Sequence, residues 1–328
     1  MRRSHAVWIP LALLSLVFAC GSDDSSNGAS TADAGGGGDG GGGGDGGAGG
    51  KGDGGGDCTA LPSLPSTCNG SVASTSTAAT GLPDVPSGLT VTSGFKMEVV
   101  ASIDSARELA ALPNGDLLVG TNGSAMYIIP NAEADGAPGK SAKFADAQDN
   151  NPAGVTYVST TCSIYWGTNK GVYKATYKDG DLTGDFGSAP IAHVRQGNPT
   201  PGSDGDVHAT TSVAVSNGTL FASVGSGCNA CTEVDPTRAT IQQMNADGSN
   251  MTTKASRIRN AIAITTNPDT GTVWAGGAGQ DSLPLGHPYE FFDAVTSHAA
   301  EADYGWPDCE ENHNAYGSGA DCTNAVQP

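Results

Sequence analysis

Two short segments contain the side chains best suited to chemistry. His208 opens one β-rich run, and Arg259-Asn260 opens a later run in the equivalent place. An imidazole with an ordinary pKa near ~6.5 can accept a proton near neutral pH, and a planar guanidinium binds carboxylates and carbonyls through paired hydrogen bonds. We therefore single out His208 as a candidate base and Arg259 as a candidate ligand-binding group. A structural histidine and a salt bridge between neighbouring sheets are the alternatives.

The cysteines offer a second kind of chemistry. Cys228-Asn-Ala-Cys231 has the spacing of a redox dithiol or of half a zinc site, but the sequence has no second such pair and no surrounding βαβ pattern. A structural disulfide is therefore the favoured interpretation. Proximity in sequence predicts two more bonds, Cys58–Cys68 and Cys309–Cys322, and leaves Cys162 as the odd cysteine, although sequence alone does not fix connectivity.

The elements that must position these residues are short strands. From about residue 93 onward, apolar residues fall in brief β-rich runs separated by glycine, proline and asparagine, and no stretch sustains an amphipathic helix. The predicted class is all-β. Four runs share one scheme of strand, tight turn and second strand, with the second strands near residues 118, 165, 221 and 273.

The repeat indicates a β-propeller. The spacings of 47, 56 and 52 residues are typical of propeller blades, whereas a β-sandwich predicts strands at roughly 8 to 12 residue intervals without this longer period. At about 52 residues per blade, residues 93–328 supply four to five blades. We therefore expect an incomplete propeller, either a fragment or a chain whose missing blades come from elsewhere.

The order of several segments resembles the glucose/sorbosone dehydrogenase family, of the soluble quinoprotein glucose dehydrogenase type. The similarity runs from about Ser93 to Cys309 and is carried by residues 205–215, 225–231, 239–248, 256–264, 268–274 and 304–309. It implies a six-bladed propeller that holds pyrroloquinoline quinone over its channel. A histidine there takes the proton from a sugar hydroxyl while hydride passes to the quinone.

The resemblance also assigns roles to residues. It matches His208 to the catalytic histidine and Arg259 and Asn260 to the cofactor contacts. It further implies calcium, bound partly through backbone carbonyls of Gly279 and Gln280, because hard oxygen ligands suit that ion. The expected substrate is a sugar or a related alcohol or aldehyde, with an electron acceptor that the sequence does not indicate. The competing hypothesis is a non-catalytic cell-surface propeller that binds a ligand or a protein partner.

The N-terminus predicts export and lipidation. Residues 1–20 combine Arg2 and Arg3 with an apolar run too short to span a membrane, and Val17-Phe-Ala-Cys20 resembles the lipobox of bacterial lipoproteins. Lipidation at Cys20 is the favoured interpretation, and an ordinary signal peptide with an incidental cysteine is the alternative. Gly21 after the cysteine favours the outer membrane.

A linker then separates this anchor from the folded part. Residues 21–57 form a predicted disordered tether, since 17 of the 22 residues from 35 to 56 are glycine, and such a coil reaches roughly 35 Å. A Ser/Thr/Pro-rich lead-in, residues 58–92, precedes the propeller domain, residues 93–328. The net charge of −19 disfavours nucleic acid and anionic membrane surfaces as partners, so the membrane contact is expected only through the lipid.

Overall fold

The computed structural model describes residues 68, 77–133, 137–149, 151–195, 208–284, 286–298, 301–310, 314–316 and 319–327. The predicted signal peptide, Cys20, the tether, Cys58 and much of the lead-in lie outside these residues. In the described part, no helix has the length and apolar character required to traverse a bilayer.

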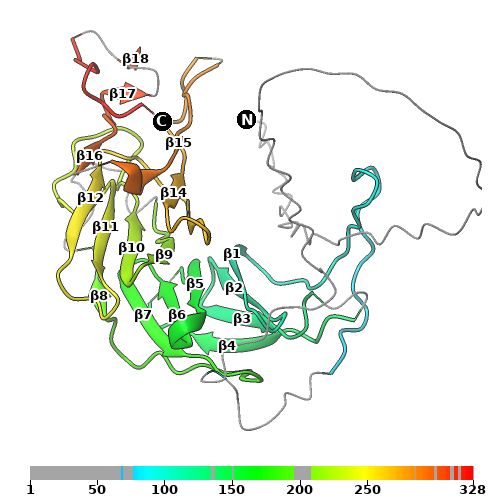
Figure 1. Cartoon of the computed structure of the whole chain (residues 1–328). Helices are drawn as coiled ribbons and strands as arrows, with labels where there is room; N and C mark the ends of the chain where they lie inside the picture. The colour runs from blue at the N-terminus through cyan, green and yellow to red at the C-terminus, as the bar shows by residue number, and fades with distance from the viewer. Residues whose placement is uncertain are drawn as a thin grey trace, which may run out of the picture.

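The described chain is all-β, and four of its sheets follow one another around an arc (Figure 1). The first two sheets, here called blades 1 and 2, each have four strands paired in chain order. Blade 1 contains β1 (Ala106–Ala111), β2 (Leu117–Thr121), β3 (Ala125–Ile129) and β4 (Ala142–Asp146). Blade 2 contains β5 (Gly154–Val158), β6 (Ser163–Gly167), β7 (Gly171–Thr176) and β8 (Ala192–His193).

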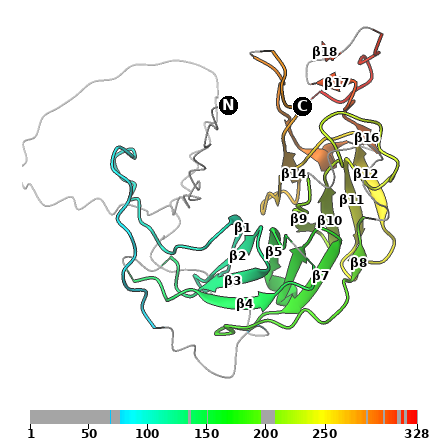
Figure 2. The same ribbon diagram turned by 180° about the vertical axis from the view of Figure 1, so that it is seen from behind.

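Blades 3 and 4 continue the arc. Blade 3 contains β9 (Val213–Ser216), β10 (Thr219–Val224), β11 (Thr240–Asn245) and β12 (Thr252–Ser256), with the later strand β16 (Ala302–Asp303) parallel to β12 at its edge. Blade 4 contains β13 (Ala263–Thr266), β14 (Val273–Gly276) and β15 (Phe292–Asp293). A two-stranded sheet of β17 (Cys309–Glu310) and β18 (Asn314–Ala315) lies beyond it. The view from behind shows the same succession of sheets (Figure 2).

This arrangement confirms the predicted class and the blade repeat. Four blades are present among the described residues, at the lower end of the expected four to five. The repeated hairpins are also confirmed: Asn217 and Gly218, with φ of 49° and 78°, connect β9 to β10 in the register Ser216↔Thr219. Both central residues of a type I′ turn need a positive φ, which asparagine and glycine adopt at least cost.

The blades are held together because their strands are apolar on both faces. On β6, Ile164 and Trp166 pack against blade 1, and Tyr165 between them packs against blade 3. On β10, Leu220 likewise faces blade 2, and Phe221 faces blade 4. Successive side chains of a strand point to opposite faces, so each strand of this kind joins two interfaces.

The disulfide pattern corrects one prediction and confirms two. Cys228–Cys231 and Cys309–Cys322 are bonded as predicted, but Cys68 pairs with Cys162 and not with Cys58. Cys162 is therefore not the odd cysteine. The reason is the fold. Cys162 follows the 3-10 turn η2 (Ser159–Thr161) in a left-handed conformation. Its Cα atom lies 5.4 Å from the Cα atom of Cys68, although the two residues are 94 positions apart in the sequence.

The first strands of successive blades contact one another, and hydrogen bonds around one carboxyl group link all four blades. Glu108 of β1 accepts a hydrogen bond from the Ser212 hydroxyl, next to β9, and this hydroxyl also lies 2.9 Å from the Ile262 carbonyl oxygen beside β13. Burial raises the pKa of Glu108 from 4.5 to about 8, against the opposing effect of its hydrogen bonds to Ser212 and the Val155 backbone. A carboxylic acid here is thus favoured over a carboxylate.

This shift predicts a pH-dependent stability. Below about pH 4.5 Glu108 is protonated in both the folded and the unfolded chain, whereas above about pH 8 the folded state carries the full cost of the buried charge. The free energy of unfolding should therefore fall by about 4 kcal/mol from pH 4.5 to pH 8 through this group. In Glu108→Gln this part of the decline should vanish in urea titrations at several pH values. An unchanged pH slope in that variant would contradict the assignment.

Candidate functional site

The segments that precede β9 and β13 bring the predicted site residues together. Gly225, which follows β10, lies between them: a Cβ placed there would be 2.5 Å from His208 Cβ and 2.8 Å from Asn260 Oδ1. The Ser226 amide donates to the Arg259 carbonyl at 2.8 Å. Any residue larger than glycine at 225 would separate His208 from Asn260, so the close approach depends on the missing side chain.

His208 has a defined tautomer. Its Nδ1 lies 2.9 Å from the Ser226 carbonyl oxygen and 2.8 Å from Ser226 Oγ, and that hydroxyl donates to the Cys228 carbonyl. A carbonyl oxygen only accepts, so Nδ1 carries the hydrogen, and the neutral ring keeps its lone pair on Nε2. The arrangement leaves Nε2 as the atom that can accept a proton.

The surroundings keep this imidazole neutral. Burial lowers the pKa of His208 below 6.5, and the positive charge of Arg259 lowers it further. The Ser226 backbone and the Asp281 carboxylate act in the opposite direction but do not outweigh these effects. At neutral pH the ring is therefore predominantly an unprotonated base.

Arg259 is buried and held by two residues. Its side chain is 4% exposed, its Nη2 lies 2.5 Å from Asp281 Oδ2, and Nη2 and Nε donate to the side-chain and backbone oxygens of Asn229 at 2.9 and 3.1 Å. Among the residues that the structure describes, the hydrogen-bond partner of Nη1 is the Ala278 carbonyl, at 3.5 Å, which is the outer limit of a hydrogen bond. That edge of the guanidinium is the part available to an anionic or carbonyl ligand.

Arg259 thus forms a salt bridge, but its partner follows β14 of the same blade that Arg259 precedes, so this is not the bridge between neighbouring sheets that the sequence offered as the alternative. Asp281 lies in the loop after β14 and is 75% exposed, so the pair neutralises the arginine at the surface. The sequence did not identify Asp281, which follows the predicted calcium ligands Gly279 and Gln280, or Asn229 as a partner of Arg259. No sequence pattern identifies these contacts, because they join loops 22 and 30 residues apart.

The predicted metal loop has a defined geometry. The Gly279 amide donates to Glu290 Oε2 at 2.6 Å, and Gln280, which is 7% exposed, donates through its side chain to the Pro307 carbonyl. Among the described residues, one group of metal-ligating side chains lies close enough to share an ion, Cys228, Cys231 and Glu233, and its cysteines are bonded to each other. The carbonyls of Gly279 and Gln280 therefore remain a prediction as calcium ligands.

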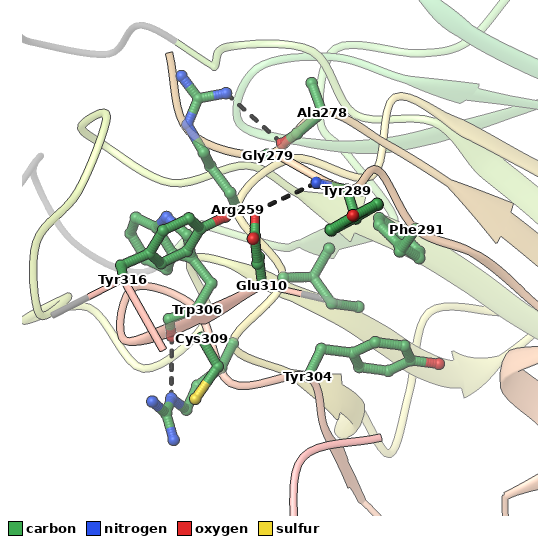
Figure 3. Close-up of a pocket in the computed structure, with 12 residues that line it drawn as sticks. Arg259, Ala278, Gly279, Tyr289, Phe291, Tyr304, Trp306, Cys309, Glu310 and Tyr316 are labelled. Atoms are coloured by element: carbon green, nitrogen blue, oxygen red, sulfur yellow. Dashed lines mark hydrogen bonds between the residues drawn. The ribbon is translucent and has the colours of Figure 1, made fainter. Parts of the chain in front are cut away.

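A cleft adjoins Arg259 on the side of this loop (Figure 3). It has an empty volume of about 330 Å³, part of it open to solvent, and its wall includes Gly279, Tyr289, Trp306 and Glu310. Glu310 is buried and accepts a hydrogen bond from the Tyr289 amide at 3.2 Å. Arg259 lines this cleft and His208 does not, so a ligand in the cleft would contact the arginine and not the candidate base.

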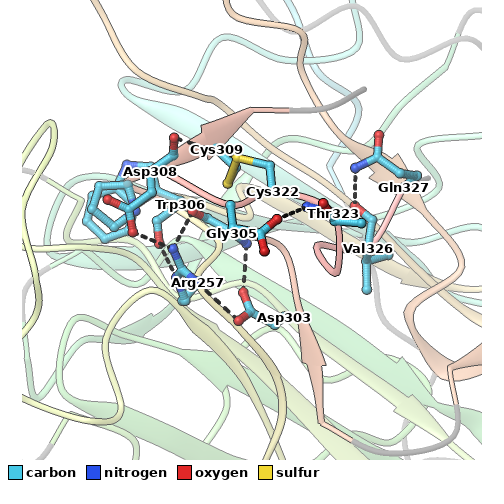
Figure 4. The surroundings of a disulfide bond; sticks show 12 residues. Arg257, Asp303, Gly305, Trp306, Asp308, Cys309, Cys322, Thr323, Val326 and Gln327 are labelled. Carbon is cyan, nitrogen blue, oxygen red and sulfur yellow. Dashed lines mark hydrogen bonds and ion pairs between the residues drawn. A yellow bond between two sulfur atoms is a disulfide. The ribbon is translucent and has the colours of Figure 1, made fainter. Parts of the chain in front are cut away.

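The segment around Trp306 and Cys309, which lines the cleft, is held by the Cys309–Cys322 disulfide and by contacts of the surrounding residues (Figure 4). Arg257 donates to the Gly305 and Trp306 carbonyls and forms ion pairs with Asp303 and Asp308. These contacts fix the turn that presents Trp306, whose indole Nε1 donates to the Asn229 carbonyl at 3.2 Å.

Several solved structures share this fold. A family AA12 carbohydrate-active enzyme from Trichoderma reesei matches with a TM-score of 0.59 and 18% identity, over 76% of this chain and 73% of the other. The PQQ domain of pyranose dehydrogenase from Coprinopsis cinerea matches with a TM-score of 0.56 and 19% identity, over 71% of this chain and 61% of that domain. The soluble aldose sugar dehydrogenase of Escherichia coli matches with a TM-score of 0.50 and 16% identity, over 69% and 71%.

At these identities the likeness shows the fold alone, a β-propeller. No family model matches the sequence, and no curated protein matches it.

Proposed function

We propose that the chain is a quinoprotein oxidoreductase that oxidises a sugar or a related alcohol or aldehyde. The observation that carries the proposal is the approach of a neutral His208 to Asn260 around Gly225, beside Arg259, in the segments that precede the first strands of two successive blades. The solved structures of similar fold support it, because they include a holo PQQ domain and an aldose sugar dehydrogenase.

The residues present fit a quinone of this kind. Pyrroloquinoline quinone bears carboxylates and carbonyls, and the Nη1 edge of Arg259 can donate to such groups. Asn260, buried beside His208, would contact the same ligand. When bound, the quinone supplies the acceptor for a hydride. Calcium, held partly by the Gly279 and Gln280 carbonyls, would complete the site, and a calcium structure exists for the Trichoderma enzyme.

The chain itself supplies the proton chemistry. The Nε2 lone pair of His208 would accept the proton of a substrate hydroxyl, while Nδ1–H remains bonded to the Ser226 carbonyl. The resulting imidazolium would be stabilised by that hydrogen bond and by the Asp281 carboxylate, and opposed by Arg259. The neutralising pair of Arg259 with Asp281 limits this opposition.

Quinone binding tests the proposal directly. With pyrroloquinoline quinone at 100 times its dissociation constant, and calcium present, the free energy of unfolding should rise by about 2.7 kcal/mol, measured by urea denaturation. Calcium alone should give a much smaller change. If quinone with calcium neither binds in calorimetry nor stabilises the chain, the enzyme hypothesis fails and a non-catalytic binding propeller takes its place.

We also propose that the protein is lipid-anchored at Cys20, with the outer membrane as its site, on the lipobox-like sequence alone. In a bacterial host, the wild-type chain should incorporate labelled palmitate and sediment with the outer membrane. Cys20→Ser should abolish both. Continued labelling of that variant would place the lipid elsewhere.

A further inference from the structure

We propose that the loop closed by the Cys228–Cys231 disulfide is a positioning element for Arg259 and that it acts through Asn229. The consequence for cofactor affinity rests on the proposed function. The disulfide joins residues whose Cα atoms are 6.2 Å apart and closes a loop that contains only Asn229 and Ala230. Such a ring leaves the backbone between the cysteines little freedom.

Hydrogen bonds within the connection from β10 to β11 hold the loop on both sides. The Ser226 hydroxyl donates to the Cys228 carbonyl at 2.7 Å, and the Gly227 amide donates to Glu233 Oε1 at 2.6 Å. Cys228 is 5% exposed and packs with Trp306 and Ala239 in a small apolar cluster. The position of Asn229 is therefore determined by the buried Cys228 on one side and by the partly buried Cys231 and Glu233 on the other.

Asn229 accepts two hydrogen bonds from the guanidinium of Arg259, an arrangement called the fork below. Arg259 Nε donates to the backbone oxygen and Nη2 to the side-chain oxygen of this one residue, at 3.1 and 2.9 Å. Two parallel hydrogen bonds to a planar group set its orientation as well as its place. The guanidinium is consequently turned so that Nη1 faces Ala278 and the cleft.

The same asparagine organises the neighbours of Arg259. Its side-chain oxygen also accepts from the Asp281 amide at 2.8 Å, and its carbonyl accepts from the Trp306 indole. Asp281 is 75% exposed, and an ion pair with an exposed carboxylate orients its partner weakly. Asn229 is thus the partner that fixes Arg259, and Asp281 mainly balances its charge.

The experiment measures the arginine in the full chain without cofactor. Arginine Nε–H exchange with solvent is followed by nuclear magnetic resonance, with the Arg259 signal assigned through its loss in Arg259→Lys. We expect at least about tenfold faster exchange in the double variant Cys228→Ser/Cys231→Ser, which releases the backbone oxygen that accepts from Nε. A smaller increase is expected in Asn229→Ala, which keeps this oxygen and removes the side-chain acceptor of Nη2. The matched control Asn245→Ala removes a comparable asparagine contact, to Ser249, in an exposed turn of blade 3 and should change the rate less than about twofold.

A second readout is the dissociation constant of pyrroloquinoline quinone in calorimetry, which should rise about tenfold in Asn229→Ala and stay within about twofold in Asn245→Ala. Unchanged Arg259 exchange in both loop variants, with their circular dichroism intact, would overturn the positioning role. Faster exchange together with no quinone binding even by the wild type would support the positioning role and refute the proposed function instead.

Discussion

His208→Gln is expected to lower kcat/KM for quinone-dependent oxidation of an accepted sugar by about 1000-fold, the middle of the range for loss of a general base. Glutamine can still donate to the Ser226 carbonyl, but it offers no basic lone pair where Nε2 lies. Because the substitution removes chemistry and not the Arg259 contact, the quinone dissociation constant should change less than about threefold. Dye reduction and calorimetry measure the two quantities separately.

His193→Gln is the matched control for this experiment. His193 lies exposed on the edge strand β8 of blade 2, and its substitution should leave kcat/KM within about twofold of the wild type. If His208→Gln kept more than a tenth of the wild-type activity, another group would have to be the base.

The pH profile of the same reaction carries a second test of His208. Burial and Arg259 lower its pKa, so kcat/KM should hold steady near neutral pH and decline only as the pH falls through values below 6.5. Arg259→Gln removes the positive charge, so the pKa of His208 should rise and the decline of kcat/KM at acid pH, the acid limb, should begin at a higher pH. A limb that stays in place would mean that the titrating group is not beside Arg259.

The fold could be predicted because its signals are local and repeated. The Asn217-Gly218 turn requires nothing beyond its own residues, and the runs around Leu118, Tyr165, Phe221 and Val273 recur at blade spacing. Strands with apolar residues at consecutive positions, such as β6, also indicate burial on both faces. The edge strand β16 escaped prediction because it returns to blade 3 from beyond blade 4, and a two-residue strand has no periodicity.

The sequence predicted the proximity of the candidate site residues but not the contacts that hold them, and this difference has a physical cause. His208 and Arg259 stand at equivalent places before successive inner strands, so a repeat brings them near one another. Asn229 and Ser226 lie in loops whose partners are set by side-chain contacts across the fold, and neither residue type is unusual in a loop. Such contacts leave no repeating pattern in the sequence, so they can be identified only from the structure.

Cys68→Ala/Cys162→Ala is expected to lower the free energy of unfolding by about 4 to 5 kcal/mol, the largest stability effect predicted for this chain. The bond closes a segment of 94 residues, which includes all of blade 1 and the beginning of blade 2, so its loss restores much conformational freedom to the unfolded chain. Both sulfur-bearing residues belong to the core between blades 1 and 2.

Backbone hydrogen bonds around the Cys68–Cys162 disulfide connect it to neighbouring strands, so loss of the bond should also weaken these strands. The Asp179 amide donates to the Cys68 carbonyl and the Tyr177 amide to the Cys162 carbonyl, each at 2.8 Å, so the disulfide ties the chain before blade 1 to the end of β7. Cys309→Ala/Cys322→Ala is the matched control, since its bond spans 13 residues and should contribute about 3 kcal/mol. Urea denaturation should therefore rank the long-range bond above the short one by more than 1 kcal/mol. The reverse order, or a peptide map that joins Cys58 to Cys68, would refute the Cys68–Cys162 pairing and restore Cys162 as a free thiol.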